Sequence, residues 1–206
     1  MSDLSIQPIE SLRHYKGIAF PEEVHFRQLL VTGPPGVGKS TMIVALGGWS
    51  EEGYLDLGRK HWWRSEILAV RPREIHLGLP FRGLRHAVSV FDAQFLGCEP
   101  LPTIDYERIV LPPRKSHFFA VDWYRRYVFD FLLPSADLVY ERRSERARHS
   151  SHPVDAQLSL SICAAQLTVF RDIAEFLHRQ GFQVYLREGD DGRLGRFAAE
   201  PQSQSS

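Results

Sequence analysis

The fold is decided by the stretch QLLVTGPPGVGKST, residues Gln28–Thr41. From Gly33 to Ser40 it matches the pattern G-x-x-x-x-G-K-[ST] at every fixed position, directly after an apolar run. Glycines let the backbone N–H groups of such a loop converge on an anion, and the following helix adds its positive N-terminal end. A plain turn rich in glycine and proline would require neither a strand before the loop nor a helix after it. The stretch therefore predicts a site for a nucleoside triphosphate.

The residues of this phosphate loop have expected roles in holding the triphosphate. Lys39 would reach the β- and γ-phosphates, and the hydroxyl of Ser40 would bind Mg²⁺. ATP and Mg²⁺ are therefore the predicted cofactors. The base preference is left open, although the sequence lacks an Asn/Thr-Lys-x-Asp motif for guanine. The further candidates for contact with the nucleotide are Gly33, Pro34, Pro35, Gly36, Val37, Gly38 and Thr41.

Length, composition and charge narrow the class of protein. The chain has 206 residues, of which 43% are hydrophobic, so it is long enough for one substantial domain. Lys plus Arg and Asp plus Glu number 25 each, so a nucleic-acid partner would need a local basic patch rather than an overall positive charge. We expect an N-terminal arm or short edge element over residues 1–24, a P-loop domain over 25–199 and a disordered tail over 200–206.

Other composition features bear on location and on metals. Residues 1–6 have neither the basic region nor the apolar region of a signal peptide, and no stretch reaches a membrane-spanning length without a charge. We therefore expect a cytoplasmic protein with no membrane partner. Cys98 and Cys163 are expected to be small buried hydrophobic residues. The histidines do not show the spacing of zinc ligands, so no zinc site is predicted.

The alternation of apolar and turn-forming segments predicts the fold class. Strands are expected at residues 25–32, 53–56, 87–91, 127–133 and 182–186. With helices between them, they predict an α/β fold with a three-layer, doubly wound, mainly parallel sheet of five strands. The ligand crevice of such a sheet lies at the C-terminal ends of its strands, where the phosphate loop, Asp56 and Asp92 would emerge.

Two helices are predicted near the end of the chain. Ser135 is a candidate N-cap for the first, with Asp137 in the first turn. Gly181 is expected just past the C-terminus of the second. The apolar stripe of the second helix has alternating spacings of four and three, at Cys163, Leu167, Phe170, Ala174 and Leu177.

Beyond the loop, the chain resembles the branch of P-loop proteins that includes shikimate, gluconate and adenylate kinases. The resemblance runs from about Phe26 to Arg187. It rests on the loop, on a carboxylate ending the second expected strand (Asp56), on a strand ending in Leu-Leu-Pro, and on the arginine-bearing segment 141–148. It implies transfer of the γ-phosphate of ATP to a small molecule.

The resemblance also implies where the acceptor binds. In such kinases a carboxylate at the position of Asp56 orients the acceptor hydroxyl or takes its proton. The alternative for Asp56 is an exposed aspartate in a turn. Arg59 and Arg64 follow closely and would favour an anionic acceptor.

Two further groups of residues are candidates for the phosphate-transfer site. Asp92 ends an apolar strand, the pattern of a carboxylate that holds Mg²⁺ through water, although it could instead cap a helix. Asp122 and Asp130 compete for this role, but Asp122 lies in an expected helix and Asp130 in the middle of an expected strand.

The second group is the arginine segment. Arginines on a lid stabilise the transferring phosphate in kinases of this branch, and Arg142 and Arg146 share one helix face. The alternative is a solvated helix face on which glutamates pair with the arginines.

These observations together predict an ATP- and Mg²⁺-dependent phosphotransferase, a P-loop kinase acting on a small polar or anionic acceptor. Two alternatives stay open: an enzyme resembling polynucleotide 5′-kinase, and a regulatory or assembly ATPase that acts through a protein partner. Residues 97–115, with four prolines, could serve the latter as a partner surface or serve a kinase as a substrate lid.

Overall fold

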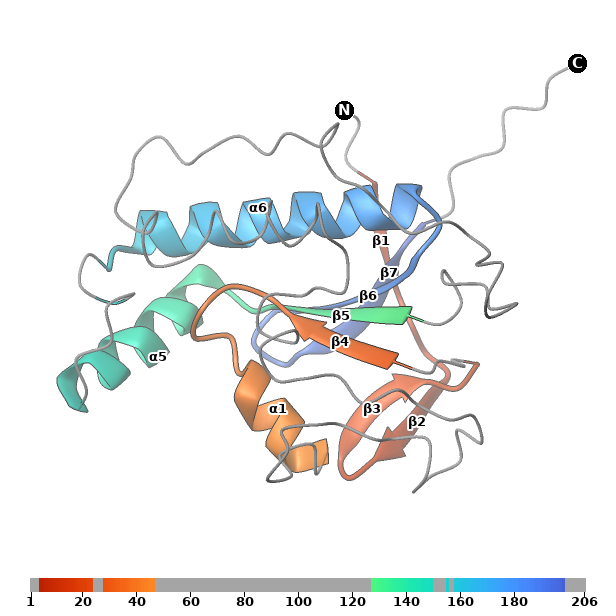
Figure 1. Ribbon diagram of the computed structural model, residues 1–206, viewed down its shortest axis with the longest axis horizontal. Helices are drawn as coiled ribbons and strands as arrows, with labels where there is room; N and C mark the ends of the chain where they lie inside the picture. Colours follow the sequence, from red (N-terminus) through yellow and green to blue (C-terminus); the bar gives the residue numbers. More distant parts are fainter. Residues whose placement is uncertain (1–3, 24–27, 47–126, 150–154, 156–157, 199–206) are drawn as a thin grey trace, which may run out of the picture.

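The computed structural model describes residues 4–23, 28–46, 127–149, 155 and 158–198 (Figure 1). The strands expected at 53–56 and 87–91 lie outside these residues, as do Cys98 and the segment 97–115.

A sheet of five strands forms the centre of the described part, in the order β1-β7-β6-β5-β4. The three strands β4 (Gln28–Thr32), β5 (Tyr127–Leu133) and β6 (Gln183–Glu188) are parallel. β7 (Arg193–Phe197) and β1 (Ile6–Pro8) complete the sheet, and each runs antiparallel to its neighbour. The strand feeding the phosphate loop and the strand predicted at 127–133 therefore lie side by side.

The predicted doubly wound, mainly parallel sheet of five strands is wrong for this part of the chain. The observed sheet is mixed, because two of its five strands are antiparallel. β6 and β7 are joined by a tight turn in which Gly189 and Gly192 have φ of +68° and +63°. Such a turn reverses the chain at once, whereas a parallel neighbour would need a long crossover connection.

The first residues of the chain contribute more than the expected arm or short edge element. β1 does lie at the edge of the sheet, paired with β7. β2 (Leu12–Tyr15) and β3 (Ile18–Pro21) form a separate antiparallel hairpin. Its two-residue turn has positive φ at both Lys16 (+49°) and Gly17 (+80°), the backbone that matches the twist of paired strands.

The two predicted C-terminal helices are present. In α5 (Ala136–His149), the Oγ of Ser135 accepts a hydrogen bond of 3.2 Å from the N–H of Leu138, as an N-cap does. α6 (Leu160–Arg179) is followed by Gly181 at φ +87°, whose N–H donates to a carbonyl oxygen of the last turn. Both local predictions are confirmed.

The helices cover the sheet on two sides. In Figure 1, α6 runs along one side of the sheet, and α1 (Lys39–Leu46) lies on the opposite side with the β2–β3 hairpin. Four of the five residues in the predicted stripe of α6 are buried, and Leu167 is half-buried against the core. They pack with buried residues of β5 and β6 such as Phe129 and Val184.

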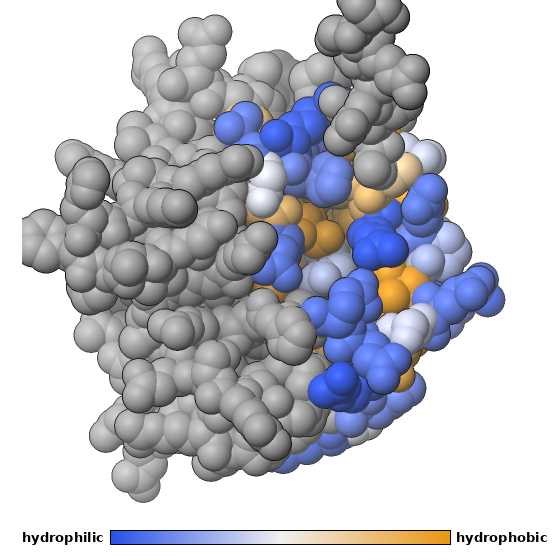
Figure 2. Space-filling view, turned by 90° about the vertical axis from the view of Figure 1, so that its right-hand side faces the viewer, coloured by the Kyte–Doolittle hydropathy of each residue, from blue (hydrophilic) through white to orange (hydrophobic). Residues whose placement is uncertain are grey.

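The described surface is mostly hydrophilic on the face that Figure 2 shows, with small hydrophobic areas between polar side chains. Within the described segments, no helix combines the length and apolarity needed to cross a lipid bilayer. The large hydrophobic residues that are exposed in the described part of the chain are Leu12, Val44, Tyr140 and Leu160.

Candidate functional site

The phosphate loop connects the end of β4 to the start of α1, as predicted. Gly33, Gly36 and Gly38 have φ of +141°, +88° and +99°, a region that other residues rarely adopt. A Cβ at Gly33 would lie 2.5 Å from the carbonyl oxygen of Leu132, and one at Gly36 would lie 2.6 Å from the Cγ of Arg143. Both the backbone and the close packing therefore require glycine in this cradle.

Lys39 is the first residue of α1, directly after the glycines of the loop, and is 7% exposed. Its Nζ donates to the carbonyl oxygens of Gly33 at 2.6 Å and Pro34 at 2.7 Å. Burial, together with the nearby positive charges of Arg146 and Arg143, lowers the pKa of Lys39 to about 7. A bound phosphate would replace the two carbonyl oxygens and favour the charged ammonium.

The remaining loop residues provide the walls of the cradle. Pro34 and Val37 are buried, and Pro35 is half-buried. Ser40 lies in the first turn of α1, the position expected of a residue that binds Mg²⁺, and Thr41 is exposed next to it. The glycine cradle and the buried ammonium fit the phosphates of ATP.

Arg142 reaches the loop from α5. Its Nη1 lies 3.4 Å from the carbonyl oxygen of Val37, and 3.8 Å from where a Cβ of Gly38 would be. The side chain is exposed, so its guanidinium stands at the rim of the cradle. The structure therefore brings this predicted lid arginine together with the phosphate loop.

Arg143 and Arg146 have different surroundings, because both bind Asp155. Arg143 is fully buried and donates from Nε to Asp155 at 2.8 Å and from Nη1 to Gln166 at 3.1 Å. Arg146 is 35% exposed and donates two hydrogen bonds, of 2.7 and 2.8 Å, to the same carboxylate. Burial acts to raise the pKa of Asp155, but the hydrogen bonds from Arg146 and Arg143 outweigh it and hold that pKa below its usual value.

These contacts divide the predicted arginine segment by role. Arg148 pairs with Glu145 on the exposed surface, where the side chains are 73% and 55% exposed, as the solvated-face alternative expects. Arg146 is partly exposed, as a lid arginine would be, but its guanidinium is also bound to the buried carboxylate of Asp155. The sequence did not indicate Asp155, because the pairing joins α5 to a residue beyond its end.

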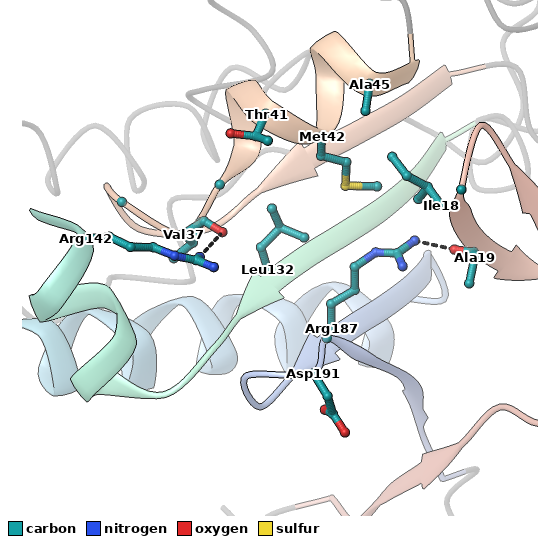
Figure 3. Close-up of a pocket in the computed structure, with 14 residues that line it drawn as sticks. Ile18, Ala19, Val37, Thr41, Met42, Ala45, Leu132, Arg142, Arg187 and Asp191 are labelled. Carbon is teal, nitrogen blue, oxygen red and sulfur yellow. Dashed lines mark hydrogen bonds between the residues drawn. The ribbon is translucent and has the colours of Figure 1, made fainter. Parts of the chain in front are cut away.

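A pocket of about 660 Å³ opens beside the phosphate loop (Figure 3). On one side it is lined by Gly36, Gly38 and Arg142, and on the opposite side by the turn and β3 of the hairpin. Its volume lies in the range of pockets that hold small molecules and cofactors, roughly 300–1,000 Å³. The residues that line it include Ile18, Ala19, Thr41, Met42, Ala45, Leu132, Arg187 and Asp191.

Arg187 crosses the floor of this pocket and pairs with Asp130. Its Nε donates to both carboxylate oxygens, at 3.1 and 3.0 Å, and its Nη2 donates to Oδ2 at 2.9 Å. Nη2 also donates to the carbonyl oxygen of Ala19 at 2.6 Å (Figure 3). Burial raises the pKa of Asp130, and Arg187 opposes that shift. The carboxylate of Asp130 is therefore engaged by an arginine in β6.

Sequence reasoning missed this pair, although a signal existed. A carboxylate in the middle of an apolar strand needs a buried cation, and Arg187 lies in the next strand of the same sheet. Cys163, by contrast, is buried as predicted and its thiol is free.

Four predicted site residues, Asp56, Arg59, Arg64 and Asp92, lie outside the described residues, so their roles stay predictions. No protein-family model, curated protein or solved structure matches the chain.

Proposed function

We propose that the chain is an ATP- and Mg²⁺-dependent phosphotransferase that acts on a small polar or anionic acceptor. One observation carries the proposal: a cradle of three glycines with positive φ surrounds a buried lysine, with an arginine at its rim. Backbone amides of such a loop, an ammonium and a guanidinium are the groups that bind and stabilise phosphoryl oxygens.

In this proposal each group of the chain has a separate task. The loop amides and Lys39 hold the β- and γ-phosphates, and Lys39 exchanges its contacts with Gly33 and Pro34 for phosphate oxygens. Ser40 and Asp92 would hold Mg²⁺, which would neutralise part of the negative charge of the phosphates. Arg142, which already stands at the rim of the cradle, would help to exclude water from the bound phosphates.

The transfer itself breaks the bond between the γ-phosphorus and the oxygen that bridges it to the β-phosphate. The acceptor hydroxyl oxygen forms the new bond to that phosphorus, and its proton passes to the carboxylate of Asp56. ADP carries away the negative charge of the leaving oxygen. While this bond breaks, Arg142 and Arg146 would stabilise charge on the transferring phosphoryl group. Arg142 is the better placed of the two, because its side chain is exposed at the rim whereas Arg146 contacts Asp155.

The test is transfer of labelled γ-phosphate from ATP, with Mg²⁺, across a panel of metabolites, nucleosides and oligonucleotides. We expect one small-molecule class to be labelled, and Lys39→Ala to abolish the labelling. Arg142→Ala should lower the rate of transfer about 10²–10³-fold, the usual effect of removing one donor to a transition-state oxyanion. Val44→Ala, on the exposed face of α1, is the matched control and should leave the rate unchanged.

The outcomes separate the proposal from its rivals. ATP hydrolysis with no labelled acceptor would contradict a kinase. Labelling of oligonucleotides alone, with strong dependence on salt, would instead identify a polynucleotide kinase.

A further inference from the structure

The pocket between the phosphate loop and the β2–β3 hairpin, here called the hairpin pocket, begins where the triphosphate would end. Thr41 directly follows the residues expected to hold the β- and γ-phosphates, and Ala45 lies one helical turn further along the same face of α1. Figure 3 shows Thr41, Met42 and Ala45 following one another along α1 toward Ile18. A ligand whose phosphates fill the cradle would therefore extend into this pocket.

The walls of the hairpin pocket are mainly apolar. Met42 from α1 and Leu132 from β5 are buried, and Ile18 from the hairpin is half-buried opposite them. The flat, apolar faces of an aromatic ring suit such walls. A highly charged acceptor would be poorly solvated between them.

The charge of the pocket floor favours a neutral ligand as well. Arg187 is neutralised by the bidentate contact with Asp130, and Asp191 adds a carboxylate at the opening. Nε and Nη2 of Arg187 make the hydrogen bonds to Asp130 and Ala19. Among the described residues Nη1 makes no hydrogen bond, so it is left to donate to a ligand.

We propose that the hairpin pocket binds the nucleoside part of the triphosphate, with its base between Ile18, Met42 and Leu132. Nη1 of Arg187 donates to a ring nitrogen or carbonyl oxygen of that base. The hairpin that precedes the phosphate loop is then the element that selects the nucleotide. This inference rests on the proposed binding of the triphosphate at the loop.

The test compares ATP with inorganic tripolyphosphate, which has the phosphates but no nucleoside. Binding of each to the full chain is measured by calorimetry for the wild type, for Ala45→Tyr, which fills the pocket, and for Val44→Tyr. Val44 is the matched control, because it is the neighbouring residue of α1, is 59% exposed and does not line the pocket. Circular dichroism checks that both variants are folded.

We expect Ala45→Tyr to weaken ATP at least about tenfold and to leave tripolyphosphate within about twofold, with Val44→Tyr unchanged for both ligands. Equal binding of ATP and tripolyphosphate by the wild type, unaffected by Ala45→Tyr, would overturn the nucleoside site while leaving the phosphate site intact. Unchanged ATP affinity with impaired acceptor phosphorylation would overturn it in favour of an acceptor pocket. Failure of the wild type to bind either ligand would overturn both this inference and the proposed function.

Discussion

Asp155→Ala tests whether the buried ion pair beneath the phosphate loop stabilises the fold. The substitution removes a carboxylate whose side chain is 2% exposed and which Arg143, fully buried, contacts at 2.8 Å. Removing one partner of a buried pair leaves the other charge in a poorly solvating interior, at a cost of about 3–5 kcal/mol. The contact with Arg146 adds less, because that side chain is 35% exposed and solvent screens it.

The measurement is urea unfolding at pH 7 followed by circular dichroism, with a thermal scan beside it. For a chain of this length the loss corresponds to a fall in Tm of about 6–20 °C. Glu145→Ala is the control on the same helix: Glu145 pairs with exposed Arg148 and His149, and its removal should cost less than about 1 kcal/mol. If Asp155→Ala is no more destabilising than Glu145→Ala, the argument from burial is refuted.

The pH dependence provides a second test of the same pair. The pKa of Asp155 is depressed in the folded state, so its contribution to stability is fully present above the ordinary pKa of 3.8 and is lost as the pH falls through the folded-state value. The difference in unfolding free energy between wild type and Asp155→Ala should therefore be constant from about pH 5 to 7 and shrink below pH 3.8. A difference that grows on acidification would contradict the assignment.

Three further predictions concern the phosphate loop and the pocket floor. Gly36→Ala should lower the free energy of unfolding by about 1–3 kcal/mol because of its positive φ, and by more because the new Cβ would clash with the stem of buried Arg143. Gly192→Ala, whose Cβ would meet nothing within 4 Å, should lose only the first amount when both variants are compared by urea unfolding. Because the pKa of Lys39 is about 7, its amine should take up a proton when ATP binds at pH 8, whereas at pH 6 it is already charged and should not. Calorimetry in buffers of different ionisation enthalpy detects this uptake, and its absence at pH 8 would contradict the role of Lys39. Arg187→Gln should lower the free energy of unfolding by about 3–5 kcal/mol, because it leaves the carboxylate of Asp130 buried without its partner. Adding Asp130→Asn to the same chain should recover part of this loss, since that buried charge is then removed. A double variant less stable than Arg187→Gln would show that the charge is not the cause.

Local features of the fold could be predicted from the sequence because neighbouring residues determine them. The phosphate loop depends on glycines at set positions, the start of α5 depends on Ser135, and the end of α6 depends on Gly181. β5 is an apolar run interrupted only by Asp130, and it can be recognised as a strand without knowledge of its partners. Each of these predictions is confirmed.

The arrangement of the sheet could not be predicted in the same way. The antiparallel position of β7 depends on a glycine turn after β6 and on pairing with β1 from the other end of the chain. β1 has only three residues, too few to show a strand pattern, and nothing in them indicates that β7 is their partner. Likewise Asp130 shows that a buried cation is needed, but only the register of β5 and β6 shows that it is Arg187.

The pairing of β1 with β7 has a consequence for the order of folding. Ile6 pairs with Phe197, so this contact joins residues that are far apart in the sequence and can form only after β7 has left the ribosome. Contacts between residues so distant in sequence form slowly, because closing the long loop costs entropy before the contact stabilises anything. We expect the hairpin and the parallel strands to assemble first, with β1 as the last strand to join. Until then the outer edge of β7 is an open backbone edge, and a newly made chain is at its most prone to aggregate.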